Sequence, residues 1–171
     1  MIETDTIKIV KYILKKNGGR IRGRKRLQKL IYFIDSLHSL PDIKFYMDLY
    51  GPYSRELNDL IMLEGDPYGI SSRLREYDDS VVVEISLIDR EEVHLEGKLK
   101  CVVDRVLHDF GGLDIIRLEQ YSSVHYITTT TGEKDPEKIK KILDLLKPSN
   151  FYTVRDIQKA IEFLEMKGYL Y

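Results

Sequence analysis

Short stretches of apolar residues at helical spacing, separated by glycine and proline, constrain the fold of this chain more than any other feature. Apolar side chains that recur every three or four residues form one face of a helix, and glycine or proline stops it. The pattern predicts helices over about residues 6–16, 23–38, 54–63, 95–110, 113–126, 135–148 and 153–168. In the second helix, the residues expected to be buried are Leu27, Leu30, Ile31, Ile34 and Leu37. The basic residues expected to face away from them are Arg22, Lys25, Arg26 and Lys29.

Three extended segments are expected in the first half of the chain. Residues 43–50 are aromatic and partly alternating, which is typical of a strand. Residues 69–76 and 80–88 are expected to form a hairpin that turns at Asp78-Asp79, because β-branched residues follow the turn. The sequence therefore predicts an α+β fold: a helix-dominated chain with a winged-helix-like N-terminal half, a small antiparallel sheet and a C-terminal helical half.

The length of 171 residues allows one domain, or two small domains that share a core. We expect a winged-helix-like segment with basic N-terminal helices over residues 1–90. A helical segment over residues 91–171 is expected to pack on it as one compact unit. A seam is expected at residues 88–92 or at Gly111-Gly112, and neither is rich enough in proline or serine to be a free linker.

Several features favour a cytoplasmic protein without a membrane partner. No apolar run approaches the roughly 18–20 residues of a membrane-spanning helix, and the first residues lack the layout of a signal peptide. A single cysteine excludes a disulfide framework within one chain. Asparagine and glutamine together number only six, while isoleucine, lysine, glutamate and tyrosine are abundant. That composition is typical of proteins from hot organisms, in which ion-pair networks gain value.

No motif in the sequence predicts catalysis. The chain has no phosphate-binding glycine loop, no zinc-binding motif and no nucleophile elbow. Its histidines, His38, His94, His108 and His125, never fall three or four residues apart. Cys101 lies on an apolar helix, where a lone thiol is usually a small core residue. We therefore expect no catalytic residue, no metal ligand and no cofactor, and we interpret the protein as a non-enzyme.

Charge is distributed unevenly along the chain. Residues 1–30 have a balance of +8, from ten basic against two acidic side chains, whereas residues 31–171 have a balance of −9, from 17 against 26. The candidate binding residues for nucleic acid or an acidic partner are Lys15, Lys16, Arg20, Arg22, Arg24, Lys25, Arg26 and Lys29. Such a cluster can neutralise phosphates and release counterions. The alternative interpretation is a solvated surface that pairs with the acidic remainder of the protein.

A second motif, Tyr50-Gly51-Pro52-Tyr53-Ser54, predicts a tight turn that leads into a helix with Ser54 as its N-cap. Free N–H groups at such a helix start could also bind an anion. The helix itself carries Glu56, Asp59 and Glu64, which makes it a poor face for a DNA groove.

The segment Leu27-Gln28-Lys29-Leu30-Ile31-Tyr32-Phe33, with a Gly-Pro step about twenty residues later, resembles the YwgA-like proteins of bacteria and archaea. It is more distantly similar to the SocA-like (Panacea) antitoxin domains. The resemblance covers roughly residues 5–65. The YwgA-like group brings no catalytic residues with it. The SocA-like group implies a non-enzymatic role, in which the domain neutralises a partner protein or presents it to a protease.

The sequence thus predicts a non-catalytic regulatory or protein-interaction module with an unidentified protein partner. The alternative is a winged-helix-like nucleic-acid-binding protein that uses the basic segment 15–29. An enzyme without a recognised motif is a third class, and no residue supports it. The oligomeric state stays open.

Overall fold

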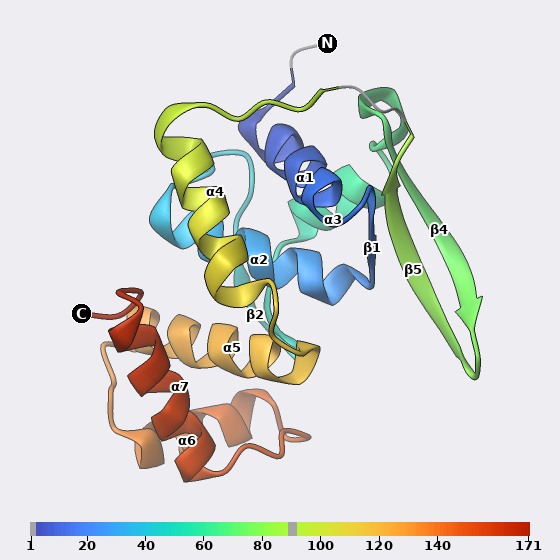
Figure 1. The fold of residues 1–171 in the computed structure, drawn as a ribbon. Coiled ribbons are helices and arrows are strands. Elements are labelled where there is room, and N and C mark those ends of the chain that lie inside the picture. The colour runs from blue at the N-terminus through green and yellow to red at the C-terminus, as the bar shows by residue number, and fades with distance from the viewer. Residues whose placement is uncertain (1–2, 89–91) are drawn as a thin grey trace. The chain divides into compact units, whose positions relative to one another are not determined.

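A computed structural model describes residues 3–88 and 92–171 (Figure 1). The protein has a helix-dominated α+β fold with small antiparallel sheets, as the sequence predicts. Its contacts divide the chain into two compact units. The first unit comprises Met1–Phe45 and Ser54–Gly111, and the second comprises Tyr46–Tyr53 and Gly112–Tyr171. No helix in the two described ranges is both long enough and apolar enough to cross a membrane.

The first unit combines four helices with a three-stranded antiparallel sheet within the described residues. In chain order its elements are α1 (Asp5–Lys16), β1 (Arg20–Arg22), α2 (Arg24–Leu37), α3 (Arg55–Met62), a 3-10 turn (Asp66–Tyr68), β4 (Ile70–Tyr77), β5 (Ser80–Leu87) and α4 (Gly97–Phe110). The strand order is β1-β5-β4, so the first strand pairs with the last. The order is a helix, a strand, two helices and a hairpin, with the first strand paired to the second strand of the hairpin. This order is the winged-helix-like arrangement expected for the N-terminal half.

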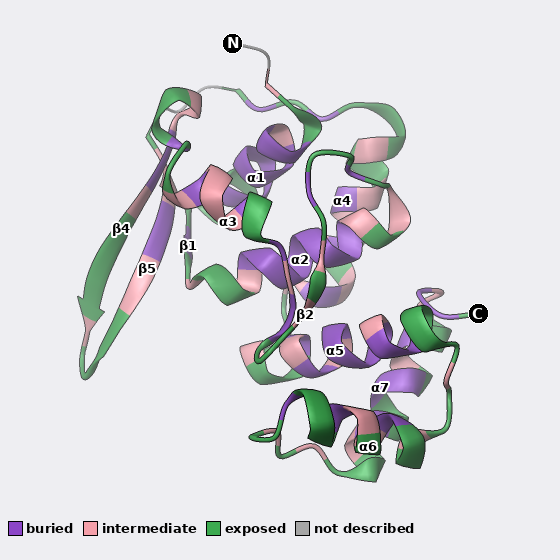
Figure 2. Cartoon of the chain, turned by 180° about the vertical axis from the view of Figure 1, so that it is seen from behind, coloured by how far each residue is buried: buried purple, intermediate pink, exposed green. Residues whose placement is uncertain are grey.

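The core of the first unit is built around α2. Leu27, Leu30, Ile31 and Ile34 are each at most 1% exposed, which confirms the predicted apolar face, and Leu37 at the end of the helix is half-buried. The adjacent Phe33 stacks on Phe110 of α4, with 3.9 Å between ring centroids. Figure 2 shows that α1 and α2 are buried along most of their length, whereas the β4–β5 hairpin becomes exposed toward its tip.

Two features of the sheet differ from the sequence prediction. Of the segment 43–50, only Tyr46–Asp48 forms a strand (β2), and it pairs with β3 (Gly51–Tyr53) in the second unit instead of joining the 70–87 hairpin. The third strand beside that hairpin is β1, which lies between two predicted helices where the sequence analysis expects no strand. Three residues are too few to give a periodic signal, and the pairing of β1 depends on a partner more than sixty residues away.

The second unit consists of the β2–β3 ladder with α5 (Ile115–Thr131), α6 (Pro136–Leu146) and α7 (Val154–Met166). Proline stands in the first turn of α6, and Thr153 forms a capping box with Asp156 at the start of α7. Helix α5 runs five residues beyond its predicted end at residue 126. The extension is rich in threonine, whose hydroxyls bond back to the helix: Thr129 donates to the His125 carbonyl and Thr131 to that of Ile127, each at 2.8 Å.

The two units do not divide at the expected boundary of residue 90. That residue lies in the segment 89–91, which is outside the described residues. Helix α4 belongs to the first unit, and the division falls at Gly111-Gly112, one of the two expected seams. Within α4, the expectation that Cys101 is a core residue is wrong, because its side chain is exposed. Val103 on the buried face is two residues away, which is about 200° around the helix.

Candidate binding surface

The basic residues of the N-terminal segment do not form one patch. Lys15 and Lys16 lie at the end of α1, where Lys16 Nζ is 5.3 Å from the centre of the Tyr12 ring. Arg20 and Arg22 lie on β1, both exposed. The remaining four candidates, on α2, are Arg24, Lys25, Arg26 and Lys29.

The α2 residues have separate surroundings. Arg24 is exposed and donates to Asn58 Oδ1 at 3.1 Å, while Arg26 is half-buried and donates to the Gly111 carbonyl at 3.2 Å. Lys25 is exposed. The expectation that Lys29 faces solvent is wrong, because its side chain is only 1% exposed. Every residue from Leu27 to Ile34 is buried, so α2 has no outer face along this stretch.

Arg20 and Arg22 instead join two arginines of the hairpin on one face of the three-stranded sheet. Arg22 and Arg73 both lie opposite Glu84 in the strand register. Arg20 is two residues before Arg22, opposite Ser86, and Arg75 is two residues after Arg73, opposite Val82. Side chains two residues apart on a strand point to the same side. Arg20, Arg22, Arg73 and Arg75 therefore share one side, here called the arginine face.

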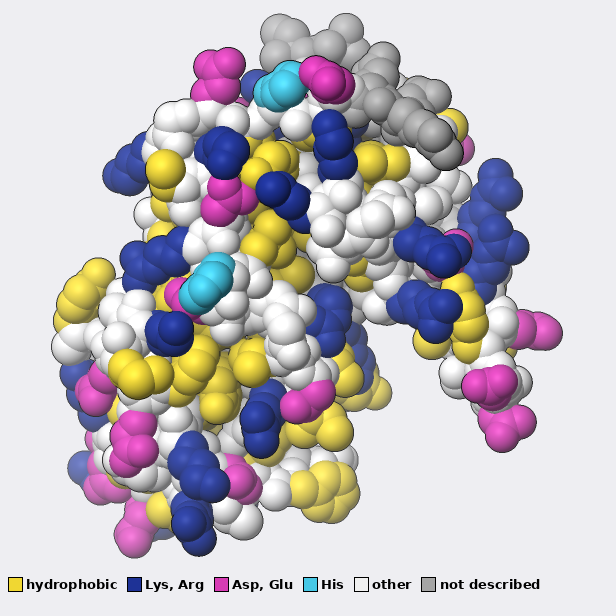
Figure 3. Space-filling view, viewed as in Figure 1, with side chains coloured by type: hydrophobic (Ala, Val, Ile, Leu, Met, Phe, Trp, Pro, Cys, Tyr) yellow, Lys and Arg dark blue, Asp and Glu magenta, His cyan; other side chains and the backbone are white. Residues whose placement is uncertain are grey.

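The opposite side of the sheet anchors it to the core of the first unit. There Ile21, Ile70 and Ile85 are at most 4% exposed. All four arginines are exposed, and Figure 3 shows Lys and Arg side chains gathered along this side of the hairpin. The sheet thus holds four guanidinium groups in fixed register, with their backbone anchored by the buried isoleucines.

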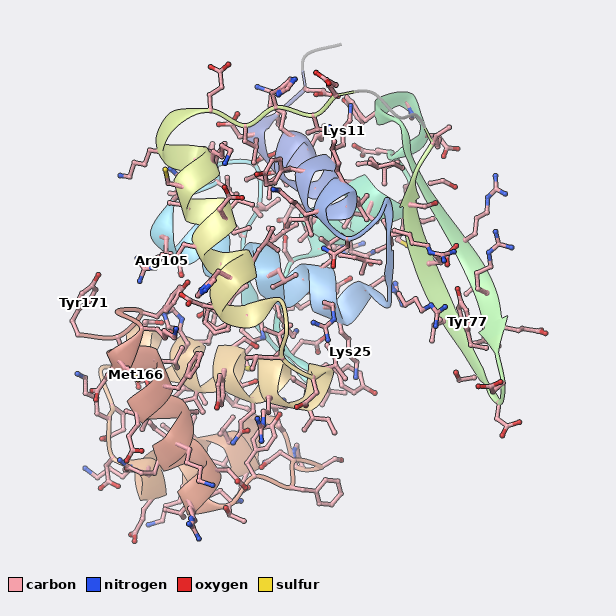
Figure 4. The ribbon with its side chains drawn as sticks, in the orientation of Figure 1. Lys11, Lys25, Tyr77, Arg105, Met166 and Tyr171 are labelled. Carbon is pink, nitrogen blue, oxygen red and sulfur yellow. The ribbon has the colours of Figure 1, made fainter. Side chains whose placement is uncertain are left out.

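Glu84 lies at the centre of the arginine face, where it is the only carboxylate on that side of the strands. Its side chain is 10% exposed, with Arg75 Nε at 3.6 Å and Arg20 Nη1 at 3.9 Å. The Tyr77 hydroxyl donates to Glu84 Oε2 at 2.6 Å, and the Arg22 guanidinium lies over the Tyr77 ring at 3.9 Å (Figure 4). The Tyr77 hydrogen bond, followed by the arginine charges, holds the pKa of Glu84 below its ordinary value. One carboxylate among four arginines leaves the face strongly positive.

Sequence reasoning found half of this surface. Arg73 and Arg75 lie some fifty residues after Arg20 and Arg22, and only the pairing of β1 with β5 brings the two pairs together. The available signal was the alternation in Ser71-Ser72-Arg73-Leu74-Arg75, which places both arginines on one side of a strand.

Helix α3, which packs against β4, carries the opposite charge. Glu56 and Glu64 are exposed and Asp59 is half-buried, with Arg55 Nε 3.8 Å from Asp59 Oδ2. A backbone hydrogen bond at the helix start and the Ser54 hydroxyl lower the pKa of Glu56. Helix α3, which follows α2 in the winged-helix-like unit, is therefore acidic.

The Tyr50–Ser54 motif acts in folding. Gly51 has φ +85°, which favours glycine, and pairs with Asp48 in the β2–β3 ladder. Pro52 and Tyr53 complete β3, and Tyr53 meets Tyr46 edge to face at 5.8 Å between ring centroids. Ser54 is the predicted N-cap of α3, because its hydroxyl accepts a hydrogen bond from Leu57 N at 3.2 Å. Tyr50 is exposed beside the turn.

The second unit contains a separate pocket of about 640 Å³ between the start of α5 and the segment before α7. Its lining residues are Asp114, Ile116, Arg117, Glu119, Gln120, Ser149, Asn150, Phe151, Tyr152 and Asp156. The amide nitrogen of Gln120 is buried and has no hydrogen-bond partner among the described residues. The unsatisfied nitrogen belongs to a lining residue and is itself buried, so the pocket gains no accessible donor from it.

A buried lysine lies beside this pocket. Lys147 is 3% exposed and donates to Glu119 Oε1 at 2.7 Å. The Tyr152 hydroxyl is 3.3 Å from the same carboxylate oxygen, and burial, followed by the Glu119 charge, raises the pKa of Tyr152. The three groups satisfy one another, and the raised pKa keeps the tyrosine protonated. In the described part of the chain, no three His, Cys, Asp or Glu side chains are grouped so that they could hold a metal ion.

Comparison with known proteins adds no family to this description: no protein-family model matches the chain, and no curated protein is significantly similar to it. The class of protein is therefore described by its fold and surface alone. It is a helix-dominated α+β chain whose winged-helix-like unit carries an arginine face on its sheet.

Proposed function

We propose that the protein is a non-catalytic interaction module that binds an acidic region of a partner protein through the arginine face. The observation that carries this proposal is the excess of charge: Arg20, Arg22, Arg73 and Arg75 surround the single carboxylate of Glu84. Glu84 can neutralise one of four charges, and Arg73 makes no ion pair within the described residues. Excess charge held on rigid strands favours binding of an oppositely charged partner.

The charge of the neighbouring helix favours a protein partner over duplex DNA. In helix-turn-helix proteins the second helix enters the major groove, and the helix after α2 here is α3. Glu56 and Glu64 on α3 are exposed, and they would repel the phosphates that border a groove. The resemblance to the YwgA-like and SocA-like proteins supports the same non-enzymatic class of function.

Nucleic-acid binding is the second candidate, because the winged-helix-like order and the hairpin arginines favour it specifically. A hairpin can contact phosphates without the helix beside it entering a groove. Such binding would be independent of base sequence and would weaken steeply with salt.

A comparison of two labelled probes, short polyglutamate and a generic DNA duplex, tests the proposal. At about 0.15 M salt, we expect the purified protein to change the fluorescence anisotropy of polyglutamate and not that of the duplex at micromolar protein. Reversal of charge at Arg73→Glu and Arg75→Glu should abolish the polyglutamate signal. Duplex binding without polyglutamate binding would overturn the proposal in favour of the nucleic-acid function.

A matched control separates the arginine face from net charge. Lys98 on α4 and Lys141 on α6 are exposed and make no ion pair within the described residues. The double variant Lys98→Glu and Lys141→Glu changes the net charge by the same amount, and we expect it to retain binding. Equal loss of binding in both double variants would overturn the assignment to the arginine face.

A further inference from the structure

The hairpin strand that carries two of the arginines is also an open sheet edge. The strand order β1-β5-β4 leaves β4 with no paired strand on its outer side in the described part of the chain, and only its start is covered there, where Ile70 N donates to the Gly65 carbonyl at 3.0 Å. Strand β4 spans eight residues, Ile70–Tyr77. Figure 1 shows its far end extending away from the helices of the first unit. An open edge of this kind presents backbone groups that can pair with another strand.

The hydrogen-bond pattern identifies which backbone groups face outward. Ile88 N donates to the Gly69 carbonyl at 2.8 Å, so Gly69 bonds toward β5. In an antiparallel ladder, hydrogen-bonded and non-hydrogen-bonded pairs alternate. Arg73 and Arg75 therefore bond inward, as Gly69 does. The N–H and C=O groups of Leu74 and Glu76 point away from β5, toward the open edge.

The two sides of this edge differ in chemistry. Arg73 and Arg75 lie on the arginine face. On the opposite side, Leu74 is 72% exposed and Val81 is 61% exposed. Leu74 lies opposite Val83 and diagonal to Val81 on this side of the hairpin, and exposed apolar side chains so placed are typical of a surface that a partner covers.

We propose that an extended segment of the partner, with alternating acidic and apolar residues, adds to the β4 edge as a fourth strand. Its acidic side chains lie beside Arg73 and Arg75, and its apolar side chains lie on the same side of the sheet as Leu74, because successive side chains of a strand point to opposite faces. Backbone hydrogen bonds give the affinity, and the alternating pattern gives the specificity. This inference rests on the proposed function and names the partner's conformation and pattern.

The charges of the hairpin define the occupant further. Glu76 and the turn residues Asp78 and Asp79 are exposed at the tip, and they repel acidic residues there, so the acidic positions are confined to the stretch beside Arg73 and Arg75. A second copy of this chain is disfavoured. Antiparallel pairing of two β4 edges would bring arginines of both copies together on one face, and like charges on neighbouring strands are destabilising.

Backbone methylation of a peptide probe tests strand addition with the wild-type protein. The probe is a labelled peptide of alternating glutamate and valine with blocked ends. Two derivatives carry N-methyl groups on alternate residues, one on all glutamates and the other on all valines. In a paired strand only one of these sets faces β4. We expect one derivative to bind at least about tenfold more weakly, since two or three hydrogen bonds are lost, and the other to bind within about threefold of the parent.

The result distinguishes the mode of binding from the proposed function. If both derivatives bind as tightly as the parent while Arg73→Glu with Arg75→Glu abolishes binding, strand addition is overturned and the acidic-partner function stands. If the double charge reversal leaves binding of the parent peptide unchanged, the proposed function fails as well. Equal weakening of both derivatives would likewise overturn pairing along a single edge.

A protein variant gives an independent check. Leu74→Pro removes an outward N–H that the β4–β5 ladder does not use, and proline is tolerated at such edge positions. Leu74→Thr is the matched control, because it loses the same apolar side chain and keeps the N–H. We expect Leu74→Pro to bind the alternating peptide at least about tenfold more weakly than Leu74→Thr. Equal binding by the two variants, with unchanged thermal unfolding, would contradict strand addition.

Discussion

The side chain of Gln28 pairs with the backbone of Ser54 through two hydrogen bonds. Gln28 Nε2 donates to the Ser54 carbonyl at 2.8 Å, and Ser54 N donates to Gln28 Oε1 at 2.9 Å. Both residues are at most 2% exposed. The amide thus joins the middle of α2 to the cap of α3. Gln28 belongs to the Leu27–Phe33 segment, and Ser54 follows the Gly51-Pro52 step. The contact between them gives both motifs of the resemblance a role in folding.

Replacement of Gln28 tests this contact. Gln28→Ala leaves the N–H and carbonyl of Ser54 buried without partners, and each such group costs about 1–3 kcal/mol. We therefore expect the free energy of unfolding in urea to fall by about 2–5 kcal/mol. Gln158 donates to Glu162 on the surface of α7, so the control Gln158→Ala should change it by less than about 0.5 kcal/mol. Equal effects of the two substitutions would contradict a structural role for the Gln28 pairing.

The helices could be predicted from the sequence because each carries its own signal. The apolar face of α2, the Ser54 cap and the Thr153–Asp156 capping box all depend on residues within a few positions of one another. Such local patterns act through helical geometry and capping alone. The predicted apolar face of α2 and the predicted Ser54 cap were confirmed for that reason.

The binding surface could be predicted only in part, because it depends on long-range pairing. No local pattern relates Arg22 to Arg73, which lie on either side of Glu84 only after β1 pairs with β5. Lys29 shows the reverse problem. Its charge predicts exposure, yet the stretch of α2 around it is enclosed by the fold. Burial of a whole helix segment depends on tertiary packing, which the helical period of one segment does not contain.

The core of the first unit can be tested at Ile31, which is completely buried on α2. Ile31→Ala removes buried methyl and methylene groups and leaves a cavity, so we expect the free energy of unfolding to fall by about 2–5 kcal/mol. Leu63, after the end of α3, is 77% exposed, and Leu63→Ala should cost less than about 0.5 kcal/mol. Chemical denaturation measures both, and a small effect at Ile31 would contradict the packing around α2.

The buried ion pair of the second unit should be sensitive to loss of one partner. Glu119→Gln leaves the Lys147 ammonium buried at 3% exposure without its carboxylate. Such a change typically costs about 3–5 kcal/mol, because the remaining charge is uncompensated. The pair of half-buried Lys140 with exposed Asp144 on α6 is the control, and Asp144→Asn should cost less than about 1 kcal/mol. Urea unfolding measures the free energy of unfolding of both variants. Equal losses in the two would contradict a stabilising role for the buried pair.

The carboxylate within the arginine face should weaken binding of acidic partners. Glu84→Gln removes the negative charge and keeps an oxygen that accepts from the Tyr77 hydroxyl. We expect polyglutamate to bind about two- to fivefold more tightly, because loss of the one carboxylate raises the positive charge of the face. Tyr77→Phe keeps the ring beneath Arg22 and the Glu84 charge, so it should change the affinity less. Weaker binding by Glu84→Gln, with unchanged thermal unfolding, would contradict a role for excess positive charge.

His125 of α5 should make the stability of the protein depend on pH. Its ring is 3% exposed, and Nε2 lies 3.1 Å from the Tyr169 carbonyl, to which the neutral ring donates. Burial lowers the pKa of His125 from 6.5 to about 4. Between these two values the unfolded chain binds a proton that the folded protein excludes, so the free energy of unfolding decreases as pH falls. The decrease attributable to this group is about 3 kcal/mol from pH 6.5 to about 4.

Substitution of His125 isolates this contribution from that of the carboxylates. His125→Gln keeps an N–H donor for the Tyr169 carbonyl and does not titrate, so its free energy of unfolding should decrease less than that of the wild type over the same pH range. His94, whose side chain is 69% exposed, provides the control, and His94→Gln should leave the wild-type pH dependence nearly unchanged, because its imidazole stays hydrated in the folded protein. Urea unfolding at pH 7, 6, 5 and 4 measures the three slopes. A His125→Gln variant that loses as much stability as the wild type would show that the buried imidazole is not the group responsible.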